Sequence, residues 1–407
     1  MLMQNTESDT PLELPAHSSP WSIFCIFLRL GLTSFGGPAA HLGYFRDEFV
    51  KRRRWLDEHT FSDLVALCQF LPGPGSSQVG IAIGRFRGGI AGALAAWLGF
   101  TLPSVLLMVA FAYGFTHLAE ANGLHLLRGL KLAAVAVVAQ AVWSMGRTLC
   151  PDRARVTIAA ASAIAVIVLG ATYGQIASIV VAGIAGALLL KSSTEVPRAP
   201  LGMPGTKAGA LLCLAVFGLL LFGLPAAAAL LHAYPLDLFA AFYRVGSLVF
   251  GGGHVVLPLL EAVVVPRGWL STNSFMAGYG AAQAIPGPLF TFAAFLGAAS
   301  TGYPAGITGA LIATVAIFLP SFLLVGAALP LWGELRAFAS MRRAMAGINA
   351  AVVGILLAAL YDPVWTSAVH SGRDFALVIV ALALLGWWRL PSWAVVLLTA
   401  LLAWWVV

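Results

Sequence analysis

Apolar segments near the length of a membrane-spanning helix recur along this chain from residue 21 to its end. A helix needs about 20 predominantly apolar residues to cross the hydrocarbon core of a bilayer. Only 10% of the 407 residues are charged, whereas soluble proteins carry about 25%. The sequence therefore predicts an all-α polytopic membrane protein, because a helix satisfies its own backbone hydrogen bonds in lipid.

The charges, the cysteines and the N-terminal segment limit the partners, cofactors and targeting signals that we expect for this protein. The net charge is +7, but the basic residues lie between the apolar segments, so no nucleic-acid partner is indicated. The four cysteines include no CxxC pair, and we expect no cofactor, metal site or disulfide. Residues 1–20 lack the basic and apolar regions of a secretory signal, and we expect them to form a disordered tail.

An internal repeat divides the chain. FLRLGLTSFGGPAAHL at 27–42 aligns with FYRVGSLVFGGGHVVL at 242–257, with seven of sixteen positions identical. Later matches keep the same order: Trp55/Trp269, Gln69/Gln283, Pro72-Gly73-Pro74/Pro286-Gly287-Pro288 and Pro103-Ser104/Pro320-Ser321. We expect two homologous halves at 21–190 and 236–407. Between them, 191–235 would hold a polar linker and one unpaired transmembrane helix.

The unpaired helix decides how the halves face each other. An even number of crossings in each half would invert the second half, and an odd number would leave the halves parallel. We expect 21–50 and 60–85 to be broken elements that re-enter, followed by spans near 87–116, 127–147, 155–170 and 173–190. This topology predicts an inverted repeat with discontinuous, re-entrant helices.

The basic residues favour this topology over full crossing of the broken elements. It gathers seventeen of the 23 Lys and Arg residues on one side, whereas full crossing separates Arg46–Arg54 from Arg85 and Arg87. The loop that matches 46–54 in the second half keeps only Arg267. By the positive-inside rule we expect a cytoplasmic N-terminus and a C-terminus outside.

The breaks themselves indicate a binding site. Irregular backbone inside a membrane must line a cavity or be buried in protein, and a half-helix N-terminus offers free N–H groups and a partial positive charge to an anion. An arginine in each half could neutralise a bound oxyanion. The candidate substrate-binding residues are Arg29, Gly36, Gly37, Pro38, Gln69, Pro72, Gly73, Pro74, Ser76, Ser77, Gln78, Arg244, Gly251, Gly252, His254, Gln283, Pro286, Gly287, Pro288 and Thr291.

Each of these features also has a structural explanation. The Gly-Gly and Pro-Gly-Pro motifs could be packing points between helices, and Arg29 and Arg244 could extend to the membrane interface. Gln69 and Gln283 could only satisfy broken backbone, while His41 and His254 are more typical of packed or interfacial histidines. Asp63 and Glu261 are candidates for proton coupling, although an interfacial carboxylate explains them as well.

At these motifs the sequence resembles the chromate ion transporter family, in its long bacterial form with two homologous halves. The resemblance lies in FGGP at 35–38, FGGG at 250–253, QFLPGPGSSQ at 69–78 and QAIPGP at 283–288, and it extends over the chain after residue 20. It implies an inner-membrane protein with antiparallel halves that exports chromate and confers chromate resistance. Sulfate is the expected competitor, because it is a tetrahedral dianion of similar shape.

Three functions remain to be compared. A chromate exporter is the leading hypothesis, since a dianion that leaves a negative interior gains about 4–5 kcal/mol at 100 mV; a proton gradient could contribute as well. An importer of sulfate or another oxyanion would use the same scaffold. A membrane-embedded lipid enzyme is the distant alternative, because acids are sparse and no His-Asp pair lies near the serines. The partners expected are chromate, sulfate and the lipid bilayer, with a homodimer left open.

Overall fold

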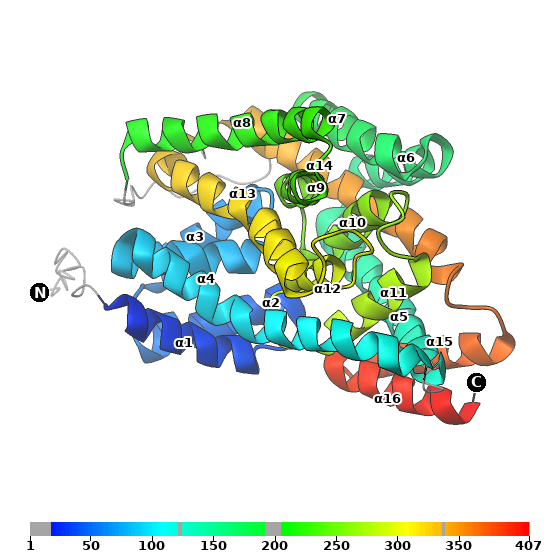
Figure 1. The fold of residues 1–407 in the computed structure, drawn as a ribbon. Coiled ribbons are helices and arrows are strands. Elements are labelled where there is room, and N and C mark those ends of the chain that lie inside the picture. The colour runs from blue at the N-terminus through cyan, green and yellow to red at the C-terminus, as the bar shows by residue number, and fades with distance from the viewer. Residues whose placement is uncertain (1–17, 121–123, 192–204, 336–337, 407) are drawn as a thin grey trace, which may run out of the picture.

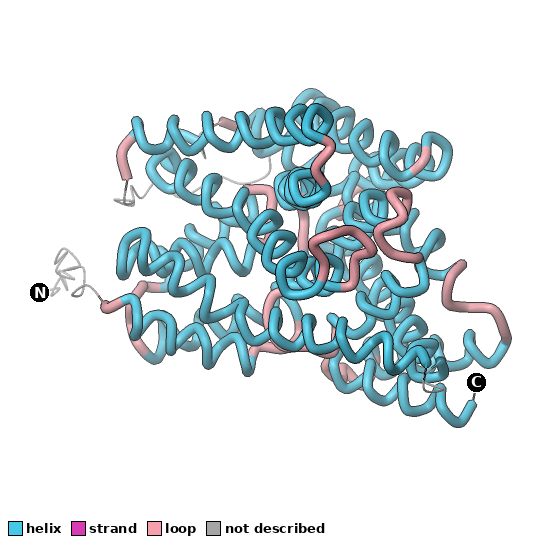
Figure 2. The backbone as a smooth tube through the Cα atoms, in the orientation of Figure 1, coloured by secondary structure: helices cyan, strands magenta, loops and turns pink. Residues whose placement is uncertain are grey.

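The computed structural model describes residues 18–120, 124–191, 205–335 and 338–406. In these residues the chain is helical without strands, and Figure 2 shows helices joined by short loops. Five helices are long and apolar enough to span a membrane: α4, α5, α8, α13 and α14. The prediction of an all-α polytopic membrane protein is therefore confirmed. Most of the expected N-terminal tail lies outside the described residues.

Among the described residues, the first half contains seven α-helices and the second half eight, with α8 between them. The first-half elements are α1 (Pro20–Thr33), α2 (Gly37–Phe45), a π-helical turn (Arg46–Arg52), α3 (Glu58–Phe70), α4 (Gly75–Glu120), α5 (Leu124–Leu149), α6 (Arg153–Leu169) and α7 (Ala171–Leu189). The unpaired helix is α8 (Lys207–Leu231). The second-half elements are α9 (Tyr234–Leu248), η2 (Gly253–Val255), α10 (Val256–Val264), α11 (Thr272–Ala282), η3 (Leu289–Thr291), α12 (Phe292–Ala298), α13 (Gly306–Leu335), α14 (Ala339–Ala359), η4 (Leu360–Trp365), α15 (Gly372–Gly386) and α16 (Ser392–Val406).

The broken elements of the first half begin and end at the same place. Helix α1 begins beside the end of the first arm of α4, where the Ser18 amide donates to the Arg87 carbonyl at 3.0 Å. Immediately after Arg87, α4 is interrupted by non-helical backbone at Gly88 and Gly89. The Arg87 guanidinium lies 4.8 Å from the ring centre of Trp55, which follows the basic loop. Both pairs of short helices thus return to the end from which they started.

The second half repeats this arrangement around Trp269. The Trp269 ring contacts Tyr234 at the start of α9 with 5.4 Å between ring centres. The Thr301 amide, which follows α12, donates to the Trp269 carbonyl at 3.0 Å. Tyr234 and Ser300 also share a hydrogen bond. The start of α9, the loop before α11 and the end of α12 therefore lie together, as the equivalent points do in the first half.

The two halves exchange helices. Helix α5 of the first half packs against α15 and α16, and α14 of the second half packs against α6 and α7. Glycines allow the closest contacts: Gly129 of α5 meets the backbone of α16 at Thr399 and Ala400, while its counterpart Gly347 of α14 meets α7 at Gly186. A side chain at either glycine would collide with backbone, so each position requires glycine for close helix approach.

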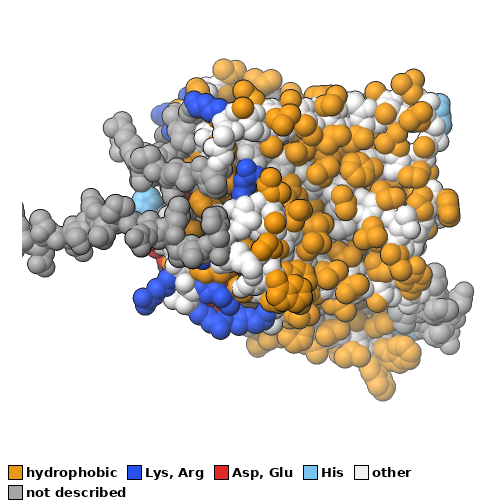
Figure 3. Space-filling model, turned by 60° about the vertical axis from the view of Figure 1, so that its left-hand side comes forward, with side chains coloured by type: hydrophobic (Ala, Val, Ile, Leu, Met, Phe, Trp, Pro, Cys, Tyr) orange, Lys and Arg blue, Asp and Glu red, His pale blue; other side chains and the backbone are white. Residues whose placement is uncertain are grey.

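Charge and hydrophobicity separate along the molecule. Figure 3 shows Lys and Arg side chains gathered at one end of the visible face, with hydrophobic side chains over most of the remainder. The described chain begins with α1 at one end of the molecule, and α16 ends at the other (Figure 1). Helix α8 joins the two halves along the outside, with only 6% of its most apolar window buried in protein.

Candidate functional site

The four breaks meet between the two halves and hold one another in place. The Gly73 amide of the first Pro-Gly-Pro donates to the Val249 carbonyl at 2.7 Å. The equivalent Gly287 amide donates to the Ser34 carbonyl at 2.9 Å. Each Pro-Gly-Pro break of one half is therefore bonded to the residue before the glycine motif of the other half, and these bonds satisfy backbone groups that the breaks would otherwise leave free.

A first cavity of about 450 Å³, which we call cavity A, lies between the first Pro-Gly-Pro and the second glycine motif. Gly73 of the break, with Gly75 and Ser76 at the start of α4, lines one side, and Gly251 and Gly252 line the other. Gln69, Ser144, Thr148 and Asn349 add polar groups to the lining. The first turn of α4 has amide N–H groups without carbonyl partners in the helix, so this end of the cavity favours an anion.

Ser76 is held by a histidine at the edge of cavity A. The Ser76 hydroxyl lies 3.2 Å from Nδ1 of His41, and both side chains are buried. The His41 ring meets Phe100 edge to face, with ring centres 5.2 Å apart. Within the described residues, His41 Nε2 and Asn349 Oδ1 have no hydrogen-bond partner. The sequence favoured a packed or interfacial role for His41, and in the structure its buried ring also contacts a cavity-lining hydroxyl.

A second cavity of about 210 Å³, cavity B, combines the opposite pair of breaks. Gly36 and Gly37 at the start of α2 lie on one side, and Gln283 and Gly287 lie on the other. His254 also lines cavity B, and its Nδ1 is 3.1 Å from the Tyr279 hydroxyl. The Gln283 side-chain Nε2 is buried without a hydrogen-bond partner in the part of the chain that is described. It is therefore a candidate donor to a bound oxygen.

The two cavities adjoin at Pro38, which lines both of them. Pro38 and Gly253 occupy equivalent positions in the two halves. A Cβ built on Gly253 would lie 3.3 Å from the Pro38 ring, so the two equivalent residues meet at the centre of the molecule. This contact explains why the second half departs from the FGGP motif: two facing prolines would compete for the same space.

Several predicted binding residues form or stabilise the backbone of the breaks and do not line either cavity. Gln78 donates from Nε2 to the Pro72 carbonyl at 2.6 Å, and Thr291 donates to the Pro288 carbonyl at 2.8 Å. Ser77 is buried outside both cavity linings. Pro72, Pro74, Pro286 and Pro288 interrupt the helices at the breaks and are absent from both linings. The helix after the first Pro-Gly-Pro begins at Gly75.

Two serines that the repeat had revealed, but that were not assigned to the site, complete this framework. The Ser104 hydroxyl donates to the Pro286 carbonyl at 2.5 Å, and both groups are buried. Its counterpart Ser321 lies 3.5 Å from Gln78 Nε2. The conserved Pro-Ser spacing within the chain was the signal that could have identified them. Asn349 carried no such signal, because it reaches cavity A from a distant helix.

The structure places the two arginines away from both cavities. Arg29 donates to Glu48 at 2.5 Å, and half of its side chain is exposed. Arg244 lines a different pocket, between α8 and α9. Their predicted role in neutralising a bound anion stays a prediction. Of the acids, Asp63 lies 3.9 Å from His59, and Glu261 lines a pocket together with Asp362.

Comparison with known proteins identifies the chain's relatives. The chromate transporter family model matches residues 21–190 and 236–404. The chromate transport protein of Pseudomonas aeruginosa is 31% identical over 99% of this chain and 95% of its own length. The chromate transport protein of Cupriavidus metallidurans is 26% identical over 92% of each chain. An uncharacterized transporter of Methanocaldococcus jannaschii is 27% identical over 88% of this chain and 87% of its own length.

No solved structure matches the chain. The family match nevertheless covers both sets of breaks, including all the residues that line cavities A and B. The chain belongs to the chromate transporter family.

Proposed function

We propose that this protein transports chromate and that the ion occupies cavities A and B during its passage. The observation that carries the proposal is the meeting of helix starts from both halves around two adjoining cavities. Helix N-termini supply amide donors and partial positive charge, which suit a dianion without a resident metal or cofactor. Ser76 and Gln283 would donate to oxyanion oxygens, one from each cavity.

The proposed direction of transport is export. A dianion that leaves a negatively charged cytoplasm gains about 4–5 kcal/mol at 100 mV, so the membrane potential alone can drive it outward. With the basic end of the molecule in the cytoplasm, chromate would enter cavity A from that side. Arg29, Arg52 and Arg53 at this end would attract the anion, although Glu48 offsets part of their charge. Asp63 and Glu261 are the groups to examine if protons are coupled.

Glycine supplies the mobility that transport requires. Gly36, Gly37, Gly73, Gly251, Gly252 and Gly287 all have positive φ values. Small changes at these positions would open one cavity and close the other, because each glycine motif is bonded to a break in the opposite half. Alternating access would then follow from movement of the two halves about Pro38 and Gly253.

The test is accumulation of labelled chromate in everted inner-membrane vesicles with an imposed membrane potential. We expect accumulation with the wild-type protein, inhibition by excess sulfate, and a reduction of at least tenfold with Ser76→Ala. Thr157→Ala is the matched control, because its exposed hydroxyl bonds only to the Arg153 carbonyl of its own helix. The control should accumulate chromate at the wild-type rate.

The other outcomes separate the alternatives. Uptake by right-side-out vesicles, without accumulation in everted ones, would contradict export and favour an oxyanion importer. Accumulation driven by a pH gradient alone would indicate proton coupling. Equal chromate accumulation by the wild type and Ser76→Ala, at equal protein levels, would remove cavity A from the proposed pathway.

A further inference from the structure

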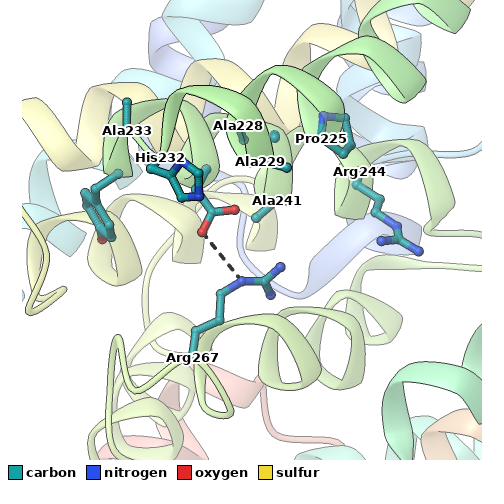
Figure 4. A pocket seen from close by; sticks show the side chains of 11 residues that line it. Pro225, Ala228, Ala229, His232, Ala233, Ala241, Arg244 and Arg267 are labelled. Atoms are coloured by element: carbon teal, nitrogen blue, oxygen red, sulfur yellow. Dashed lines mark ion pairs between the residues drawn. The ribbon is translucent and has the colours of Figure 1, made fainter.

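A pocket of about 480 Å³ lies between α8 and α9, apart from the transport cavities. Pro225, Ala228 and Ala229 of α8, with His232 directly after this helix, form one wall, and Asp237 and Arg244 of α9 form another. Arg267, from the loop after α10, lines the remaining side (Figure 4). None of the lining residues also lines cavity A or cavity B. The pocket therefore has no role in the transport path described above.

The two arginines of this pocket have counterparts in the first half. Arg244 matches Arg29, and Arg267 matches Arg53. The second match is structural as well, because Arg53 lies 5.5 Å from the centre of the Trp55 ring and Arg267 lies 5.3 Å from the centre of Trp269. The helices that follow also begin alike, with Asp57 and Ser271 each accepting from the amide three residues later.

In the first half, one carboxylate bridges the two arginines. Glu48 accepts from Arg29 at 2.5 Å and from Arg53 at 2.6 Å, and only 6% of its side chain is exposed. An arginine guanidinium can direct two N–H groups at a carboxylate or another oxyanion. The Glu48 carboxylate thus shows what kind of group the paired arginines accommodate: a compact anion with several acceptor oxygens.

The second half lacks this carboxylate. The second half is one residue shorter than the first between the glycine motif and the tryptophan that follows it. Depending on where this deletion is placed in the alignment, Glu48 matches Ala262 or Val263. Arg267 is 3.7 Å from Asp237 and donates to the Val263 carbonyl at 3.0 Å. Arg244 is exposed to the pocket and has no ion-pair partner among the described residues. Two arginines and one aspartate leave the lining with a formal charge of +1.

We propose that this pocket binds an oxyanion between Arg244 and Arg267, in the role that the Glu48 carboxylate has in the first half. The ligand is a tetrahedral group with several acceptor oxygens, such as sulfate, chromate or the phosphate of a lipid headgroup. Figure 4 shows the two guanidinium groups at separate sides of the pocket, with the dashed ion pair between Arg267 and Asp237 leaving Arg244 unengaged. The lipid-exposed α8 forms a wall, so a headgroup and a dissolved ion can both reach the site.

The experiment measures equilibrium binding of labelled sulfate to the purified full-length protein in a detergent free of phosphate. We expect Arg244→Gln and Arg267→Gln each to lower the sulfate affinity of one class of binding sites by at least tenfold. Arg373→Gln is the charge-matched control, since this exposed arginine lies outside the pocket, and it should bind like the wild type. Thermal unfolding of each variant establishes that it is folded.

A second variant tests the comparison between the halves directly. Val263→Glu supplies a carboxylate near the position of Glu48 and should abolish the same class of sulfate sites without removing an arginine. Loss of sulfate binding on adding phosphatidylglycerol, but not phosphatidylcholine, would assign the site to an anionic headgroup. Retention of sulfate in the presence of both lipids would assign it to the dissolved ion.

Wild-type sulfate binding by Arg244→Gln, Arg267→Gln and Val263→Glu would overturn the proposal. The result is independent of the transport assay, because Ser76→Ala leaves this pocket intact. Failure of chromate accumulation in vesicles would refute the proposed function alone, whereas unaltered sulfate binding by the arginine variants would refute only the second site.

Discussion

At the scale of single residues, two glycines with positive φ differ in the space around them. Gly73 has φ +121°, and a Cβ there would lie 2.6 Å from Gln78 Nε2 and 2.8 Å from Ser321 Oγ. Gly89 also has positive φ, +61°, but nothing lies within 4 Å of its Cβ position. Alanine substitution at both glycines therefore separates the free-energy cost of the unusual backbone conformation from the cost of a steric clash with neighbouring side chains.

We predict that Gly73→Ala abolishes chromate transport, while Gly89→Ala keeps most of it. Both changes put an alanine in a backbone conformation that L residues rarely adopt, at a cost of about 1–3 kcal/mol. Only Gly73→Ala also displaces Gln78, which bonds to the Pro72 carbonyl and closes the break beside cavity A. Vesicle transport at matched protein levels measures the difference. Equal transport by the two variants would contradict a structural role for the contact at Gly73.

Glu48 gives the basic loop a pH-dependent contribution to stability. Its burial opposes ionisation, but hydrogen bonds from Arg53 and Arg52 and the charge of Arg29 hold its pKa below the ordinary value. A depressed pKa means that the contribution is complete above the unfolded pKa of about 4.3 and is lost as pH falls through the folded value. The three arginines are 31–58% exposed, so solvent screening limits the effect.

We predict that Glu48→Gln lowers the stability of the purified protein by roughly 1–2 kcal/mol at pH 7. The difference from wild type should begin to shrink below about pH 4.3, where the unfolded chain takes up a proton at Glu48, and should disappear below the depressed folded pKa, where Glu48 is protonated in both states. Thermal unfolding at a series of pH values measures this, with Asp47→Asn as the control, since the Asp47–Lys51 pair is exposed on both sides. A difference that stays constant from pH 7 to pH 3 would contradict the assignment.

At the scale of elements, each half stabilises the breaks of the other. Ser104 in α4 donates to the Pro286 carbonyl in the break before η3. Ser321 in α13 reaches the first break indirectly, through Gln78. The contacts are equivalent in position and unequal in strength, because the distance is 2.5 Å for the Ser104 bond and 3.5 Å for the Ser321 contact. Hydrogen bonds weaken as the separation exceeds about 3.2 Å.

We predict that Ser104→Ala destabilises the protein by about 1–3 kcal/mol, because it leaves the buried Pro286 carbonyl without a donor. Ser321→Ala should cost less, since Gln78 remains bonded to Pro72. Thermal unfolding in detergent, with the two variants measured side by side, tests the order. A larger loss of stability from Ser321→Ala would show that the second break is held by other contacts.

At the scale of the whole molecule, the exchange of helices makes the halves interdependent. Helices α5 and α14 each pack against the terminal helices of the opposite half, and the Gly73 and Gly287 amides bond across the same boundary. The glycine amide at the centre of each Pro-Gly-Pro break donates to a carbonyl of the other half. The inverted arrangement of the halves in the membrane is a proposal that rests on the charge distribution and on the repeated contacts.

We predict that Lys51 and Arg373 lie on opposite sides of the membrane, since the proposed topology puts the basic loop inside and the start of α15 outside. Lys51→Cys and Arg373→Cys are made in a variant whose four native cysteines are replaced by alanine. A membrane-impermeant maleimide applied to intact cells should label Arg373→Cys at once and Lys51→Cys only after permeabilisation. Labelling of both in intact cells would contradict the inverted topology.

The sequence by itself determined the class of fold, the positions of the breaks and the correspondence between the halves. Hydrophobic length predicted the spans that are observed as α4 and α5, but α6 and α7, where further spans were expected, are not among the five described helices long and apolar enough to cross a membrane. Proline and glycine predicted the interruptions, because both act through the local backbone. The unpaired helix expected within 191–235 is observed as Lys207–Leu231, because its apolar run is long enough to form a helix of spanning length.

Only the tertiary structure decided which side chains face a cavity. Gln69 and Gln283 line cavities A and B, while Gln78 turns back to its own break, although all three were predicted to bind the substrate. Arg29 pairs with Glu48, whereas Arg244 faces an open pocket, because the second half has lost the bridging carboxylate. These outcomes depend on contacts between residues far apart in the chain, which form only when the two halves pack together.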